Sequence, residues 1–169
     1  MKLRTLLLMR HAKSDWGAEF SRDHDRPLND RGRRAAKRMG IWLRETDEAP
    51  EQIVSSSATR ARQTAERAAE YGGLPDPELQ PDLYGASAAG LVAVAARLPD
   101  DVERAMLVGH EPTLSSAIAL LAGATVRFPT AAVARIDLDI DRWDRIEPLT
   151  GTLIWMLPPR LLDREAAQD

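Results

Sequence analysis

Two segments of this chain place a histidine directly after an apolar run. Arg10 and His11 follow the run at residues 3–9, and His110 follows the run that ends at Val108. An apolar run of this length predicts one buried strand. Ligands of open α/β sheets bind outside the carboxyl ends of the strands, so a cation beside an imidazole there indicates a site for a phosphorylated substrate.

A further cation, Arg60, falls in the first turn of a helix predicted over residues 58–71. This position opposes the helix dipole, whose positive end favours anions. A bound anion shared by Arg60 and the helix terminus would remove the conflict. Two arginines can hold several oxygens of a phosphoryl group, and a neutral histidine can attack its phosphorus. The four residues Arg10, His11, Arg60 and His110 therefore predict phosphoryl transfer.

The elements that must position these residues alternate between strands and helices. Strands are predicted at residues 3–9, 52–55, 104–108, 133–138 and 152–157, with a short one near 78–80. Helices are predicted at residues 30–45, 58–71, 87–98 and 112–122. This order predicts an α/β fold of three layers, with a mostly parallel sheet flanked by helices on both faces. No helix separates the last two strands, so they are expected to pair antiparallel at one side of the sheet.

Composition excludes several classes of function. The 169 residues include no cysteine, which excludes disulfides, thiolate catalysis and cysteine-based metal sites. A net charge of −3 gives no electrostatic footprint for nucleic acid or an anionic membrane. No apolar run reaches the roughly 18 residues of a membrane span, and no signal peptide is evident, so a cytoplasmic protein is expected. We predict one domain over residues 1–157 and a polar C-terminal tail over 158–169.

Two charged or aromatic segments are open to more than one interpretation. The predicted helix at residues 30–45 carries a basic cluster, which is interpreted as a solvated face rather than a nucleic-acid surface because the rest of the chain is acidic. The connection over residues 10–29 is long enough to predict a functional loop. Its Trp16 is either a surface residue or part of the site entrance, and its His24 is expected at the surface.

Three blocks of sequence resemble the signature blocks of the histidine phosphatase superfamily. They are residues 9–14 (MRHAKS), 56–65 (SSATRARQTA) and 108–112 (VGHEP). The segments 26–28 and 83–87, together with the small size, resemble its SixA-type phosphohistidine phosphatase branch. The resemblance extends from residue 3 to about residue 157 and implies a phosphoglycerate mutase-like fold.

The resemblance also implies roles for individual residues. His11 is the expected nucleophile, which becomes transiently phosphorylated, and Arg10, Arg60 and His110 are expected to hold the phosphoryl oxygens. Arg26 and Ser14 are expected to add to the phosphate pocket. No metal or cofactor is implied. The expected partner is a phosphorylated protein carrying phosphohistidine, or alternatively a small phosphorylated molecule; the oligomeric state is not predicted.

The chain departs from the family pattern in two places. Ala12 follows the nucleophile where the family usually has glycine, so this backbone must avoid the left-handed region. The general acid is not assigned, and the candidates are carboxylates of the first loop and of the middle of the chain: Asp15, Asp23, Asp25 and Asp82.

The unassigned acid bears on the substrate. An alcohol leaving group needs a proton donor, whereas a phosphorylated imidazole can carry its own proton and leave neutral. Phosphohistidine is therefore the favoured substrate. A phosphatase of small phosphomonoesters, or a phosphate- or phosphohistidine-binding module with little catalysis, are the alternatives.

Overall fold

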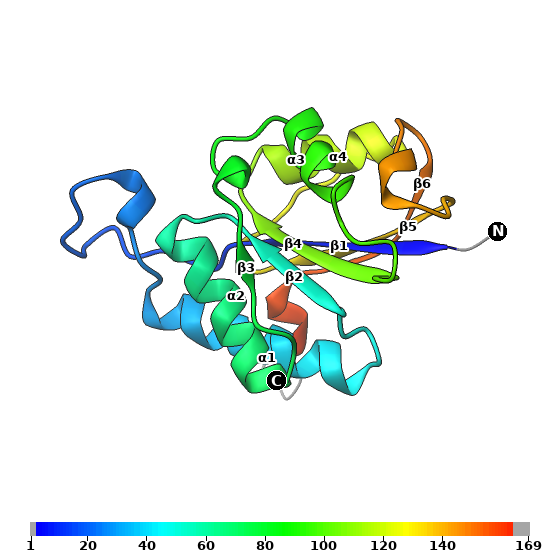
Figure 1. The fold of residues 1–169 in the computed structure, drawn as a ribbon. Coiled ribbons are helices and arrows are strands. Elements are labelled where there is room, and N and C mark those ends of the chain that lie inside the picture. The colour runs from blue at the N-terminus through cyan, green and yellow to red at the C-terminus, as the bar shows by residue number, and fades with distance from the viewer. Residues whose placement is uncertain (1–2, 164–169) are drawn as a thin grey trace.

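A computed structural model describes residues 3–163 and shows a mixed sheet covered by helices on both faces (Figure 1). Within this range the sheet has six strands in the order β3-β2-β4-β1-β5-β6. The strands are β1 (Arg4–Arg10), β2 (Gln52–Ser55), β3 (Glu78–Leu79), β4 (Arg104–Gly109), β5 (Val133–Leu138) and β6 (Gly151–Leu157).

Strand direction divides the sheet into two parts. The pairs β1–β4, β4–β2 and β2–β3 are parallel, whereas β5 runs antiparallel to both β1 and β6. The α/β fold and the antiparallel late strands are thus confirmed. β1 lies between β4 and β5, at the centre of the sheet, so its carboxyl end has neighbours on both sides.

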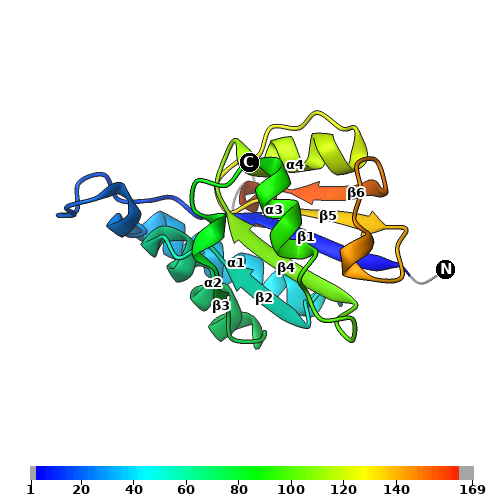
Figure 2. The ribbon, with the colours of Figure 1, turned by 45° about the horizontal axis from the view of Figure 1, so that its top comes forward.

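The helices form two pairs, one on each face (Figure 2). They are α1 (Asp30–Glu45), α2 (Thr59–Gly72), α3 (Ala88–Ala95) and α4 (Thr113–Ala122). Leu7 and Met9 of β1 pack in the core beneath α1 and α2, while Leu6 and Leu8 pack in the core of the opposite face. This alternation along a central strand explains why the apolar run is nearly continuous.

Side-chain caps fix the first residues of α1 and α3. The Asn29 side chain accepts from Gly32 N at 2.8 Å, and Ser87 Oγ accepts from Gly90 N at 3.1 Å. The helix predicted to reach residue 98 ends at Ala95, where the chain turns toward Pro99. None of the helices in the described part of the chain is long and apolar enough to cross a membrane.

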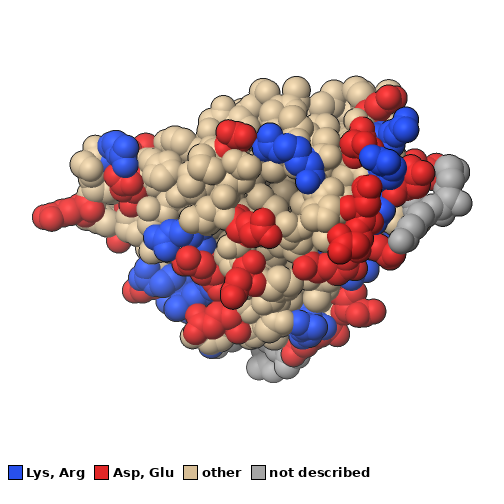
Figure 3. Space-filling model, viewed as in Figure 1, with Lys and Arg blue, Asp and Glu red and all other residues tan. Residues whose placement is uncertain are grey.

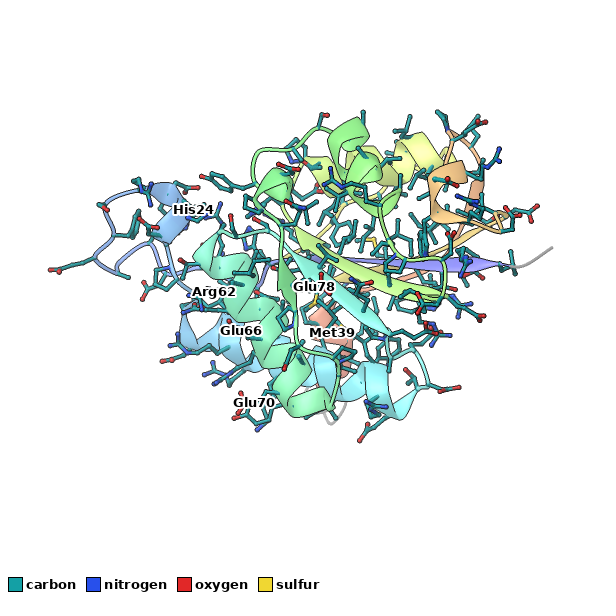
Figure 4. The ribbon with its side chains drawn as sticks, viewed as in Figure 1. His24, Met39, Arg62, Glu66, Glu70 and Glu78 are labelled. Carbon is teal, nitrogen blue, oxygen red and sulfur yellow. The ribbon has the colours of Figure 1, made fainter. Side chains whose placement is uncertain are left out.

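The two helices on the lower face of Figure 1 approach each other closely through glycine. A Cβ atom at Gly40 of α1 would lie 2.1 Å from the carbonyl oxygen of Ala68 of α2. The outward face of α2 carries Arg62, Glu66 and Glu70 (Figure 4), and both signs of charge lie side by side on that surface (Figure 3). Arg62 and Glu66 form an ion pair at 3.2 Å.

The segment after β6 turns back onto α1. Pro159–Leu162 form a 3-10 turn, η4, and Leu162 packs against the core beneath α1. Asp163 pairs with Arg38 of α1. The first part of the predicted polar tail is therefore attached to the body, and its remainder, residues 164–169, lies outside the described residues.

Candidate active site

The sheet topology brings three segments to one edge. Arg10 ends β1, and the register pairs it with Gly109, the residue before His110. Arg60 is the second residue of α2, which follows β2 on the other side of β4. The rings of His11 and His110 lie 5.2 Å apart between centroids. The structure therefore brings together the four residues Arg10, His11, Arg60 and His110.

The backbone of the nucleophile candidate is held by both neighbouring strands. His11 N donates to Gly109 O at 3.0 Å, and Arg10 N donates to Ala132 O at 3.1 Å. In return, Ala131 N lies within 3.1 Å of Arg10 O and 3.2 Å of His11 O. Ala131 reaches this position with φ +60°, in the left-handed region. His11 is therefore fixed by the sheet rather than carried on a free loop.

The ring of His11 has a defined tautomer. Its Nδ1 lies 2.8 Å from the carbonyl oxygen of Ala12, which can only accept, so Nδ1 carries the proton and Nε2 keeps a free lone pair. The side chain is buried, and burial lowers its pKa to about 4, with the nearby Arg60, Arg10 and Arg26 acting in the same direction. His11 is thus neutral at physiological pH, as a nucleophile must be.

Ser56 orients the second histidine. Its Oγ accepts from Ala58 N at 3.2 Å and lies 2.8 Å from Nε2 of His110, within hydrogen-bond distance. Nδ1 of His110 is buried and has no partner in the described structure. Burial lowers the pKa of His110 to about 3, and the charges of His11 and Arg60 add to this effect.

Unpartnered polar atoms gather at this edge. Arg10 Nε, Arg60 Nε and His110 Nδ1 are buried in the described structure without a hydrogen-bond partner. Arg10 is anchored through Nη1, which donates to Phe128 O at 2.9 Å, and burial lowers its pKa. Buried donors without acceptors are costly. A phosphoryl group beside them would supply acceptors for the two guanidinium N–H groups, and for His110 when Nδ1 carries the proton.

The carboxylate of Asp23 lies at the centre of the first loop. Its Oδ1 accepts from Arg26 Nη1 at 2.6 Å, and its Oδ2 accepts from Arg60 Nη2 at 2.9 Å and from Tyr84 Oη at 3.1 Å. Burial acts to raise the pKa of Asp23, but Arg60, Tyr84 and Arg26 together outweigh it and lower that pKa. Asp23 is therefore a carboxylate at neutral pH.

Arg26 and Ser14, which were expected to extend the phosphate pocket, are hydrogen-bonded to each other. Arg26 Nε donates to Ser14 Oγ at 3.0 Å, and the guanidinium lies 3.5 Å from the ring centroid of Trp16. Arg26 is buried, and its charge acts on His11. Trp16 is 71% exposed on the outer side of this stack, where the loop projects from the body (Figure 1).

The other three carboxylates considered as the general acid contact residues outside the site. Asp15 accepts from Gly17 N at 2.9 Å. Asp25 pairs with Arg22 at 3.2 Å, and Asp82 pairs with Arg97 at 3.2 Å. Of the four candidates, only Asp23 contacts a residue of the site.

Sequence reasoning missed several residues that support the site. Thr64 Oγ1 accepts from Ala12 N at 2.9 Å and donates to Arg60 O at 2.7 Å, so it joins the nucleophile loop to α2. Its position one turn after Arg60, within the second block, was the available signal. Ala12 itself is buried and does not adopt positive φ, as predicted.

His24, expected at the surface, lies on the first loop (Figure 4), is partly exposed, and also contacts two neighbours of the site. Its Nε2 lies 3.0 Å from Ser57 Oγ, and its ring packs edge-on against Tyr84 at 4.9 Å between centroids. Tyr84 in turn packs against His110 at 5.6 Å. These contacts span distant parts of the chain, which is why no local pattern pointed to them. In the described residues, no three His, Asp or Glu side chains are grouped so that they could hold a metal ion.

Comparison with known proteins agrees with this geometry. Residues 6–87 match the model of the histidine phosphatase superfamily (branch 1). The uncharacterized protein Rv1276c of Mycobacterium tuberculosis is 35% identical over 164 residues, covering 90% of this chain and 100% of the relative.

Two solved structures share both fold and sequence. A protein assigned as phosphohistidine phosphatase SixA from Nakamurella multipartitia is 28% identical with a TM-score of 0.82, covering 94% of this chain and 98% of that one. The protein histidine phosphatase SixA complexed with tungstate is 27% identical with a TM-score of 0.77, covering 94% and 99%. The chain therefore belongs to the histidine phosphatase superfamily, in its SixA-type branch, and is a phosphatase.

Proposed function

We propose that this phosphatase hydrolyses phosphohistidine in a cytoplasmic protein, through a phosphorylated His11 and without a metal. The observation that carries the proposal is the neutral His11, whose free Nε2 lies in a site with two buried arginine N–H groups that lack acceptors. A neutral nucleophile and an unfilled oxyanion site are the two parts that phosphoryl transfer requires.

In the first step, Nε2 of His11 attacks phosphorus, and the bond from phosphorus to the substrate imidazole breaks. The substrate ring leaves as neutral imidazole because its other nitrogen already carries a proton. Arg10, Arg60 and His110 hold the phosphoryl oxygens as their charge redistributes. In the second step, water attacks phosphorus and the bond to His11 breaks, so that both water protons leave on the released phosphate. His11 keeps its proton on Nδ1, where the carbonyl oxygen of Ala12 accepts throughout.

The state of Asp23 favours phosphohistidine over a phosphate ester. An alkoxide leaving group needs a proton donor, and Asp23 is the one general-acid candidate in contact with the site. Two arginines and a tyrosine hydroxyl bind its carboxylate and keep it ionised, which is unsuited to donating a proton. A substrate that carries its own leaving proton does not need this donor.

The test is phosphoenzyme labelling with a phosphohistidine peptide, comparing the wild type with His11→Ala and His24→Ala. The chain has three histidines, and His24→Ala is the control because His24 contacts Ser57 and Tyr84 rather than His11. We expect an acid-labile label in the wild type and in His24→Ala, and neither label nor turnover in His11→Ala. Undiminished turnover by His11→Ala would contradict the mechanism.

A panel of phosphate esters, assayed beside the peptide, tests the substrate class. Faster turnover of an ester would favour the small-molecule alternative. Tight phosphate binding without any label would favour a binding module.

A further inference from the structure

A basic cavity opens at the same sheet edge as the candidate active site. It measures about 140 Å³, several times the ~30 Å³ of a water molecule, and four cations line it together with one carboxylate. These five residues are Lys13, Arg31, Arg38, Arg160 and Asp163. We call it the basic cleft.

The strand register places the basic cleft beside the phosphate site. Met9 of β1 pairs with Val133 of β5, which pairs with Leu157 at the end of β6. The segments that follow Leu157 and precede Val133 therefore emerge beside the end of β1. Thr130, which lines the cleft, directly precedes Ala131, whose N–H bonds to Arg10 O and His11 O.

Lys13 connects the two sites directly. It lies two residues after His11, and its carbonyl oxygen accepts from Asn29 N at 3.0 Å. A Cβ atom at Gly32 would lie 2.2 Å from the same oxygen, so the backbone of Lys13 is pressed against the first turn of α1. The Lys13 side chain lines the cleft while its backbone continues the nucleophile loop.

The charges of the basic cleft are not balanced by the described residues. Asp163 pairs with Arg38, but Arg38 Nε is buried without a partner. Lys13, Arg31 and Arg160 form no ion pair with any residue that the structure describes. A buried donor among clustered like charges is the condition that an anion relieves.

The basic residues of α1 differ in whether they line the cleft. Arg31, Ala35 and Arg38 line the cleft from successive turns of α1, and the small Ala35 leaves room between the two arginines. Arg34 and Lys37 are exposed on α1, as Arg31 is, but they do not line the cleft. The basic cluster in this helix therefore has two parts, and only one of them faces a cavity.

We propose that the basic cleft binds carboxylate side chains of an acidic segment next to the phosphohistidine of the substrate protein. The inference rests on the proposed function, because it needs a protein substrate that reaches both sites at once. Complementary charge at the rim of an interface strengthens encounter and fixes orientation more than it changes the chemical step. The cleft thus acts on substrate capture and leaves phosphoryl transfer unchanged.

The experiment compares the double variant Arg31→Glu/Arg160→Glu with Arg34→Glu/Lys37→Glu, which makes the same charge change outside the cleft. The substrates are a phosphohistidine peptide with acidic flanks, one with neutral flanks, and phosphoimidazole. We expect the cleft variant to raise KM for the acidic peptide about tenfold at low salt, with kcat and the other two substrates unchanged. The control variant is expected to change KM for the acidic peptide less than twofold.

Three results would overturn the proposal. One is an unchanged KM of the cleft variant for the acidic peptide, and another is an equal rise in the control variant. The third concerns a free anion: if inorganic sulfate changes phosphoimidazole turnover in the wild type but not in the cleft variant, the cleft holds a small ion rather than substrate.

Binding of the unphosphorylated acidic peptide separates this inference from the proposed function. Its affinity, measured from tryptophan fluorescence, is expected to fall about tenfold in the cleft variant even if no substrate is turned over. Absence of turnover in the wild type would then contradict the proposed function alone, and equal peptide affinity in both proteins would contradict the cleft.

Discussion

Arg60 donates to Asp23 twice, from Nη1 to the backbone oxygen at 2.8 Å and from Nη2 to the carboxylate at 2.9 Å. This pair resolves the conflict at the start of α2, where a cation opposes the helix dipole. The first loop supplies a resident anion, and Arg60 Nε stays free. A phosphorylated substrate therefore meets an arginine that is already oriented.

Asp23→Asn is expected to keep most of the phosphohistidine turnover. The amide still accepts from Arg60 and Tyr84, and the backbone bond to Arg60 is unchanged, whereas a missing general acid costs about 10²–10⁴ in rate. We expect kcat within about tenfold of wild type and a higher KM, since the loop is held less tightly. Asp25→Asn is the neighbouring control. A loss of kcat beyond about 100-fold in Asp23→Asn alone would instead identify Asp23 as the proton donor.

Arg10→Met is expected to remove phosphate binding without unfolding the protein. Burial disfavours the Arg10 charge, so its loss offsets the lost bond to Phe128 O, and the free energy of unfolding should stay within about 1 kcal/mol of wild type. Phosphate at about 100 times its Kd should stabilise the wild type by about 2.7 kcal/mol and leave the variant unchanged. Denaturant unfolding with and without phosphate measures both. Equal stabilisation of the variant by phosphate would place the anion elsewhere.

The buried histidines predict a loss of stability in acid. His110 has a pKa of about 3 in the folded chain, whereas an unfolded histidine titrates near 6.5, so the unfolded state binds the proton first as pH falls. Stability is therefore full above about pH 7 and falls toward pH 3, by about 2 kcal/mol from this residue between pH 7 and pH 5. His110→Gln should remove that part of the pH dependence, measured by urea unfolding in phosphate-free buffer. Parallel stability profiles of variant and wild type would contradict a buried neutral His110.

Thr64→Val is expected to destabilise the protein and to slow turnover together. The valine fits the same space but leaves Ala12 N without its acceptor, which costs about 1–3 kcal/mol for a buried donor. Thr64→Ser keeps the hydroxyl and should restore both properties. If Thr64→Val matches the wild type in unfolding and in kcat, the hydroxyl does not hold the nucleophile loop.

The sequence was sufficient to predict the location of the site residues that follow a strand or begin a helix. Arg10, His11 and His110 follow apolar strands, so the strand boundaries alone place them at one sheet edge. The position of Arg60 follows from the start of α2. Each of these predictions depends on local periodicity and on one general rule about sheet topology.

The choice among the general-acid candidates depends on contacts between distant segments, which local sequence patterns do not encode. Asp23 could not be separated from Asp15, Asp25 and Asp82 because its partners Arg60 and Tyr84 lie 37 and 61 residues away. The same holds for the core: Trp143 is fully buried and donates to Val102 O at 2.8 Å, although charged residues surround it in the sequence. Tertiary packing overrides the local composition at such positions.

The attachment of His11 to both neighbouring strands has a consequence for how this enzyme can change. The backbone of His11, the proposed nucleophile, is hydrogen-bonded to the sheet, whereas Asp23 and Tyr84 come from the first loop and from the segment after β3. A new substrate preference can therefore arise by exchanging residues 15–22 and the segment around residue 84, while Asp23 keeps Arg60 oriented. The residues at the end of β1 and at the start of α2 would stay unchanged. The molecule is therefore divided into a fixed part for phosphoryl transfer and a replaceable part for substrate recognition.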